Sequence, residues 1–183
     1  MTHPMAGPKK NVVAEAVAQL CPQCAMCCNG VLFKDVELQP GDDAARLKQL
    51  GLLFSKSRKP KFPQPCAALN GCRCQLYADR PARCREFECA LLKSVAAGET
   101  GMPAALRAIR ETQKRAEKVR RLLRASGDFE ESLGLSLRFQ RTQRRLESAG
   151  ISEAAADTYG ELTLAVHDLN LVLRAKFYPA PGD

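Results

Sequence analysis

Apolar residues recur every three or four positions through the C-terminal part of the chain, which is the period of an amphipathic α-helix. This pattern predicts three consecutive helices, the first of them beginning near Met102. Their apolar stripes are Leu106, Ile109, Ala116, Val119 and Leu123; then Leu135, Phe139, Thr142 and Leu146; and then Leu162, Val166, Leu169, Leu173 and Phe177. Because the connections are short, we expect an antiparallel bundle or a helical layer around the rest of the chain.

The ends of these three helices are marked by residues that stop or start a helix. The predicted stops are Gly127, Gly150 and Pro179. Asp128 and Glu131 resemble a capping box for the second helix, and Ser152 is placed to cap the third.

The first hundred residues are patterned less regularly and predict short elements. Asn11 is placed to cap a helix that runs to Leu20, and a second helix is predicted over residues 42–50. The apolar run 31–33 and the alternating run 36–38 predict two short strands that pair with each other.

Turn residues dominate the following segment. Residues 55–65 are rich in proline and lysine and predict an exposed connecting loop. Asn70-Gly71 predicts a tight turn, and Pro81 is suited to the first position of a short helix. Cys84 and Cys89 are therefore expected on or near one helix, about a turn and a half apart.

Nine cysteines interrupt this part of the chain. Four of them form the spacing C-x2-C-x2-C-C between Cys21 and Cys28, and such closely spaced thiols hold the irons of ferredoxin-like clusters. Neighbouring side chains point apart, so Cys27 and Cys28 are interpreted as ligands of different metals, or as a pair in which one bridges two. The predicted metal ligands are Cys21, Cys24, Cys27, Cys28, Cys66, Cys72, Cys74, Cys84 and Cys89.

Buried apolar thiols and a disulfide framework are the two alternatives to metal binding. Four thiols within eight residues argue against the first. The second is disfavoured because no secretion signal and no uncharged apolar window of membrane length is present, so we expect a cytoplasmic protein with reduced thiols and no membrane partner. An odd number of cysteines also argues against complete pairing.

Thiolate-only ligation suits zinc and an iron–sulfur cluster about equally, and the spacing of the first group favours iron. Eight of the nine cysteines are enough for two four-thiolate sites, and one cluster with remaining free thiols is the alternative. His3 lies in the N-terminal tail and His167 on the third helix, so neither is expected to be a ligand. The arginines that surround the second cysteine stretch are placed to offset thiolate charge: Arg73, Arg80, Arg83 and Arg85.

The fold class expected from these patterns is mainly α. It combines a small irregular Cys-rich metal-binding core, in which a short β-hairpin is an open alternative, with three C-terminal helices. The expected division is a flexible tail over residues 1–10, a Cys-rich metal-binding domain over 11–100 and a helical region over 101–178.

The net charge of +8 is compatible with nucleic acid or with an acidic partner. Basic residues are frequent in the first of the three C-terminal helices: Arg110, Lys114, Arg115, Lys118, Arg120, Arg121 and Arg124. These positions spread around the helix, and no aromatic residue lies there to stack on a base. Nucleic acid is therefore not expected as a partner, and an unidentified protein partner stays open.

The order of the cysteine motifs resembles the CxxCxxCC family, the YkgJ-like cysteine-cluster proteins. The resemblance covers roughly residues 15–95 and rests on Cys21–Cys28, Cys66, Cys74-Gln-Leu-Tyr, Arg80-Pro81 and Cys84-Arg-Glu-Phe. It implies a small bacterial domain that chelates zinc or iron. Many members of the family have glycines where this chain has Ala25-Met26.

The function expected from the sequence is metal binding through clustered thiolates, with a redox or electron-transfer role as an extension. One alternative is a protein-modifying enzyme, because members of the wider family resemble flagellin lysine methylases. The sequence has no glycine-rich nucleotide fingerprint, no G-x-S-x-G turn and no H-E-x-x-H pair to support an enzyme. A basic interaction module with structural zinc is the other alternative.

Overall fold

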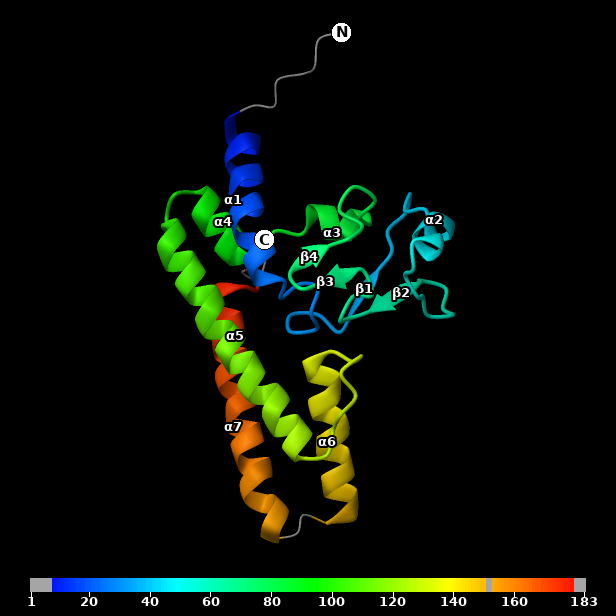
Figure 1. Ribbon diagram of the computed structural model, residues 1–183, viewed down its shortest axis with the longest axis vertical. Helices are drawn as coiled ribbons and strands as arrows, with labels where there is room; N and C mark the ends of the chain where they lie inside the picture. Colours follow the sequence, from blue (N-terminus) through cyan, green and yellow to red (C-terminus); the bar gives the residue numbers. More distant parts are fainter. Residues whose placement is uncertain (1–7, 151–152, 180–183) are drawn as a thin grey trace.

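The computed structural model describes residues 8–150 and 153–179 (Figure 1). Within these ranges the chain forms seven helices and two small antiparallel strand pairs, which confirms the mainly α class. The helices are α1 (Pro8–Cys24), α2 (Ala44–Gln49), α3 (Ala82–Glu86), α4 (Ala90–Ala96), α5 (Met102–Ala125), α6 (Leu135–Ala149) and α7 (Glu153–Lys176). The strands are β1 (Asp35–Glu37), β2 (Lys61–Pro63), β3 (Leu69–Asn70) and β4 (Arg73–Cys74). No helix in the described residues is long and apolar enough to cross a membrane.

The three predicted C-terminal helices are present as α5, α6 and α7. α5 and α7 pack along each other, and α6 packs against α5 (Figure 1). The predicted stripes form the contact: Ile109, Ala116, Val119 and Leu123 of α5 are buried together with Leu162, Leu169 and Leu173 of α7. Ser152, the expected cap of α7, lies outside the described residues.

The capping box expected before α6 is wrong. α6 begins later than that motif requires, with Gly134 and not Asp128 at its N-cap. Asp128 accepts a 2.7 Å hydrogen bond from Nε of the buried Arg138, and Glu131 pairs with Arg124 instead of turning back to Asp128. A buried guanidinium attracts a carboxylate more strongly than a free helix N–H does, because an unpaired buried charge is costly.

The N-terminal helix is longer than expected. It starts at Pro8, so Asn11 lies inside it, and it continues through Cys21 to Cys24. α1 packs against α4 and against the first half of α5, so the larger of two apolar cores extends from Leu20 through Leu92 to Leu123 and Leu173. The larger core therefore combines residues of the segment 11–100 with residues of the helical region that follows it.

The strand pair expected from residues 31–33 and 36–38 is only half correct. Residues 35–37 form β1, but the partner is β2, with Val36 opposite Phe62. Val31 and Leu32 are buried in the larger core instead. The segment 61–63 was expected to be exposed loop, yet Phe62 is only 2% exposed because it fills the smaller core.

The remaining short elements surround that smaller core, which is made of Leu47, Leu52, Phe62, Ala68 and Leu76. The predicted turn after Asn70 is confirmed as the connection of the β3–β4 hairpin, where Gly71 has a φ of 57°. α2 and α3 also form where helices were predicted. Cys84 and Cys89 do not share a helix, because the chain becomes extended at Phe87: Cys84 lies on α3, and Cys89 is the N-cap of α4.

Candidate metal centre

The C-terminal end of α1 carries the first two thiols of the site. Cys21 and Cys24 are three residues apart on this helix, so their side chains lie on the same face. The helix stops at Ala25, whose φ of 54° is the left-handed conformation that favours glycine. The side-chain amide of Gln113 on α5 donates to the last carbonyls of α1, at 2.8 Å to O of Gln23 and 3.3 Å to O of Cys24.

Two further thiols join this end of α1. Cys27 lies in the turn that follows the helix, and Cys89 lies at the start of the neighbouring α4. Burial is the main cause that raises the pKa of these thiols. Every pair among the four also interacts, because the negative charge of one thiolate raises the pKa of the other. Cys24, Cys27 and Cys89 all pack on the larger core. We call Cys21, Cys24, Cys27 and Cys89 the helix thiol set.

The other four clustered thiols gather around the β3–β4 hairpin. Burial raises the pKa of Cys28, and the thiolates of Cys84, Cys66 and Cys74 raise it further. The thiolate of Cys74 likewise raises the pKa of Cys66 and of Cys84, and the thiolate of Cys66 raises the pKa of Cys84. Cys66, Cys74 and Cys84 all pack on the smaller core. We call Cys28, Cys66, Cys74 and Cys84 the hairpin thiol set.

A backbone hydrogen bond connects the two cysteine stretches of the sequence. The N–H of Cys66 donates to O of Cys28 at 2.8 Å, which holds the loop after β2 against the turn after α1. Cys27 and Cys28, which are adjacent in that turn, fall in different thiol sets. Charge also acts between the sets, because the thiolate of Cys28 raises the pKa of Cys27 and that of Cys21 raises the pKa of Cys28. The ninth thiol, Cys72, lies in the hairpin turn and interacts electrostatically with Cys24.

Backbone N–H groups point at several of the sulfurs. Met26 donates to the sulfur of Cys24, and Ala68 donates to that of Cys66. The sulfur of Cys89 receives N–H groups from the first turn of α4, including those of Leu91 and Leu92. These bonds lower the pKa of their thiols, against the larger rise that burial causes, because a donated hydrogen bond favours the charged form.

Arg80 is the arginine that the structure brings between the two sets. Its guanidinium lies 3.8 Å from the centroid of the Tyr77 ring and donates to O of Cys84 at 3.4 Å. Its positive charge lowers the pKa of Cys21 in one set and of Cys84 in the other, although burial raises both pKa values by more. The other three expected arginines, Arg73, Arg83 and Arg85, are exposed.

Cys24, Cys27, Cys28 and Cys84 are in their protonated form near neutral pH. Burial raises the pKa of Cys24 and of Cys28 to about 12 and that of Cys84 to about 11, and it raises the pKa of Cys27 well above its usual range. A metal ion binds the thiolate, so it must displace these protons.

The donor chemistry of both sets fits zinc or an iron–sulfur cluster, which accept four thiolates. All nine cysteines are free thiols. Within residues 8–150 and 153–179, no three Cys, His, Asp or Glu side chains are yet placed as ligands of a single ion. The four thiols of each set must therefore rotate toward a common point to hold one. His167 is exposed on α7, and His3 lies outside the described residues.

Two residues that shape the site have no local signal in the sequence. Gln113 holds the end of α1 from 90 positions away. Asp42 accepts a 2.8 Å hydrogen bond from the N–H of Ala82 and so caps α3, which carries Cys84. Both act between distant segments, and neither lies near a cysteine in the sequence.

Comparison with known proteins identifies a family for this chain. No curated protein and no solved structure matches the chain. A family model does match residues 20–119, which include all nine cysteines, α4 and most of α5. The match reaches beyond the expected 15–95 into the helical region. It spans more than half of the chain, so the protein belongs to the CxxCxxCC family, described as a putative zinc- or iron-chelating domain.

Proposed function

We propose that this protein binds two separate metal centres, one in the helix thiol set and one in the hairpin thiol set. The observation that carries the proposal is the division of eight thiols into two complete groups of four. Three thiols of one group pack on the larger core, and three of the other pack on the smaller core. Four thiolates are a full ligand set for a zinc ion or for an iron–sulfur cluster.

Each centre would connect separate segments of the chain. The helix thiol set joins the end of α1 to the start of α4, and the hairpin thiol set joins the turn after α1 to β4 and α3. A zinc ion bound there supplies folding free energy, and an iron–sulfur cluster can in addition accept and release an electron. Because the smaller core contains only five buried residues, the hairpin region gains the most from a bound metal.

The half-buried Arg80 supports the same proposal. A four-thiolate zinc site carries a net charge of about −2, so two such sites side by side need a compensating cation. Arg80 already interacts with a thiol of each set and is held by its contact with Tyr77.

The test is purification without exposure to air, followed by zinc and iron analysis per chain and a visible absorption spectrum. The proposal predicts two centres: two zinc ions and no colour, or two clusters with a broad absorption band that dithionite bleaches. A protein that holds a single centre, or none after reconstitution with zinc and with iron and sulfide, would overturn it.

A further inference from the structure

α5 presents a continuous row of basic side chains to solvent. At 100° per residue, five of its basic residues fall within an arc of about 80°, so these do not spread around the helix as the sequence suggested. They lie at positions i, i+3, i+7, i+11 and i+14 over about 21 Å of helix. This basic stripe consists of Arg107, Arg110, Lys114, Lys118 and Arg121, all of them exposed.

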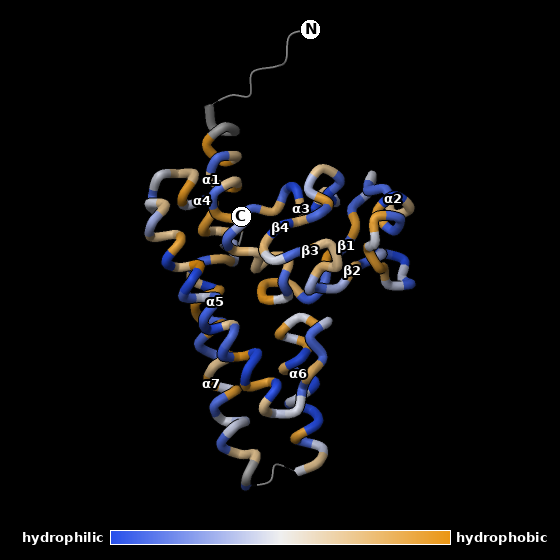
Figure 2. The backbone as a smooth tube through the Cα atoms, in the orientation of Figure 1, coloured by the Kyte–Doolittle hydropathy of each residue, from blue (hydrophilic) through white to orange (hydrophobic). Residues whose placement is uncertain are grey.

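The charge of the basic stripe is largely uncompensated. In the part of the chain that the structure describes, only Lys118 forms an ion pair, at 3.0 Å to Glu161 of α7. Two more carboxylates lie nearby on α5. Glu117 pairs with Arg120 and Arg124, which lie off the stripe. Glu111 is exposed between the stripe and the groove described next. Figure 2 shows that hydrophilic residues predominate along α5. A solvent-exposed row of like charges repels itself, so an acidic ligand would be attracted to it.

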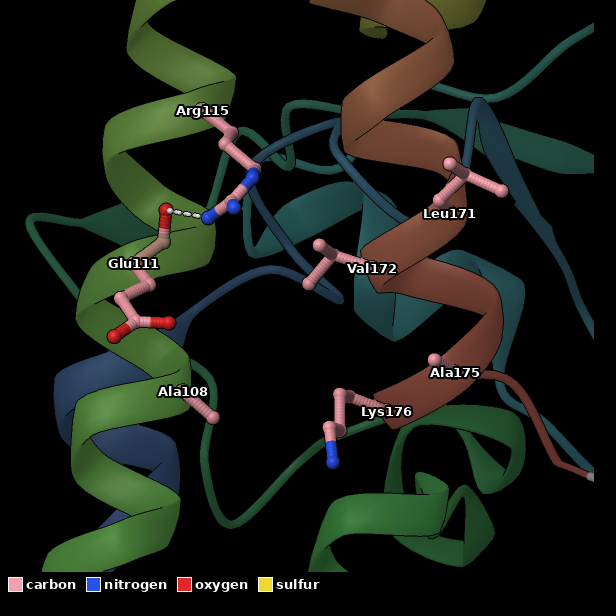
Figure 3. A pocket seen from close by; sticks show the side chains of 7 residues that line it. All are labelled: Ala108, Glu111, Arg115, Leu171, Val172, Ala175 and Lys176. Carbon is pink, nitrogen blue, oxygen red and sulfur yellow. Dashed lines mark hydrogen bonds between the residues drawn. The ribbon is translucent and has the colours of Figure 1, made fainter.

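A shallow apolar groove of about 320 Å³ lies beside the stripe, between α5 and α7 (Figure 3). It is lined by the apolar residues Ala108, Leu171, Val172 and Ala175, of which Val172 points toward α5, and by the charged residues Glu111, Arg115 and Lys176. Leu171 is 53% exposed, and Leu164, two turns away on the same side of α7, is 67% exposed. These two leucines add exposed apolar surface in line with the groove, with the exposed His167 and Asp168 between them on α7.

We propose that this face of α5 and α7 binds an acidic amphipathic helix of a partner protein. The groove and the exposed leucines would take the apolar side of such a helix, while its carboxylates would lie along the basic stripe. Charge complementarity selects an acidic partner, because the stripe carries five positive charges and Arg115 and Lys176 add two at the groove.

A nucleic acid fits this face less well. Phosphates would use the basic stripe, but they have no use for the apolar groove next to it, and α5 carries no aromatic side chain on which a base could stack. The proposal does not depend on the metal centres, because the residues that carry it lie on α5 and α7 and none of them is a thiol.

The probe for the test is a fluorescein-labelled synthetic helical peptide of about 18 residues, with leucines along one side and glutamates beside them. Three reference ligands accompany it: the same peptide with leucines replaced by serine, the same peptide with glutamates replaced by glutamine, and a duplex DNA of 20 base pairs. Binding to the full-length protein is followed by fluorescence anisotropy at low and at physiological salt.

We expect the amphipathic acidic peptide to bind at least tenfold more tightly than each reference ligand. R107E with K114E should weaken its binding about tenfold or more, and so should L171Q. The matched controls are R141E with R144E on the exposed face of α6, and L53Q in an exposed loop, which should leave the affinity unchanged.

Equal binding of the serine peptide or of the duplex would show that the stripe only attracts anions, and this would overturn the proposal. An affinity weaker than millimolar for the amphipathic peptide would also overturn it. The proposal would also be overturned if R141E with R144E weakened peptide binding as much as R107E with K114E. Circular dichroism of each variant separates loss of binding from loss of folding.

Discussion

Gly30 and Gly134 lie backbone to backbone, although more than a hundred residues separate them in the sequence. A Cβ atom added to Gly30 would come within 2.9 Å of Cα of Gly134, and the N–H of Leu135 donates to O of Gly30 at 2.8 Å. Gly30 ends the turn that carries Cys27 and Cys28, and Gly134 is the N-cap of α6. This contact therefore holds the turn that supplies a thiol to each set against the C-terminal helices.

The first prediction concerns that contact. Gly30→Ala should lower the free energy of unfolding by about 2–4 kcal/mol, because a φ of 77° is strained for alanine and the added methyl group meets the backbone of Gly134. Gly41→Ala is the matched control. Its φ of 94° carries the same conformational cost, about 1–2 kcal/mol, but nothing lies within 4 Å of the added atom.

Urea unfolding of the two variants decides between strain and contact. An equal loss of unfolding free energy in Gly30→Ala and Gly41→Ala would mean that the close approach of Gly30 to Gly134 contributes nothing to stability.

The second prediction concerns the buried ion pair that fixes the start of α6. Asp128→Ala should destabilise the protein by roughly 3–5 kcal/mol, since it leaves the guanidinium of Arg138 buried without its carboxylate. Glu131→Ala removes an exposed carboxylate from Arg124 and should change the midpoint of thermal unfolding only slightly. Similar midpoints for the two variants would contradict the structural role given to Asp128.

The third prediction concerns the pH dependence of metal binding. Burial raises the pKa of Cys24, Cys28 and Cys84 to values between about 11 and 12, so below that range the metal-free protein holds these protons and binding must release them. Zinc affinity should therefore rise with pH from 6.5 to 8.5, by about tenfold per pH unit for each proton released. Competition with a zinc chelator of known pH dependence measures it. A flat affinity over this window would show that the thiols are already ionised.

The helical part of the fold could be predicted from the sequence because it depends on local pattern. The stripe of Leu162, Leu169 and Leu173 repeats at helical spacing, and those residues are buried together as predicted. The partner of β1 could not be predicted in this way. Phe62 stands in a proline- and lysine-rich segment, and only the packing of the smaller core shows that it is an inward-facing strand residue.

The candidate site was predictable in its residue types and not in its grouping. Spacing identified the thiols as potential ligands, and the family match agrees with that chemistry. Which thiols lie together depends on long-range contacts, such as the hydrogen bond from Cys66 to Cys28 and that from Gln113 to the end of α1. The expectation that Cys84 and Cys89 lie on or near one helix is correct for Cys84 on α3, but Cys89 starts a second helix, which packs on α1.

The division into two thiol sets predicts that metal can be removed from one set without loss from the other. Cys24→Ala with Cys27→Ala takes two ligands from the helix thiol set, and Cys28→Ala with Cys66→Ala takes two from the hairpin thiol set. Cys72→Ala is the control, since Cys72 belongs to neither set.

The most direct measurement is the metal content per chain of these three variants, purified without air and compared with the unaltered protein. The account predicts that each double variant keeps one of the two centres and that Cys72→Ala keeps both. Loss of all metal from both double variants, or no loss from either, would contradict the existence of two separate centres.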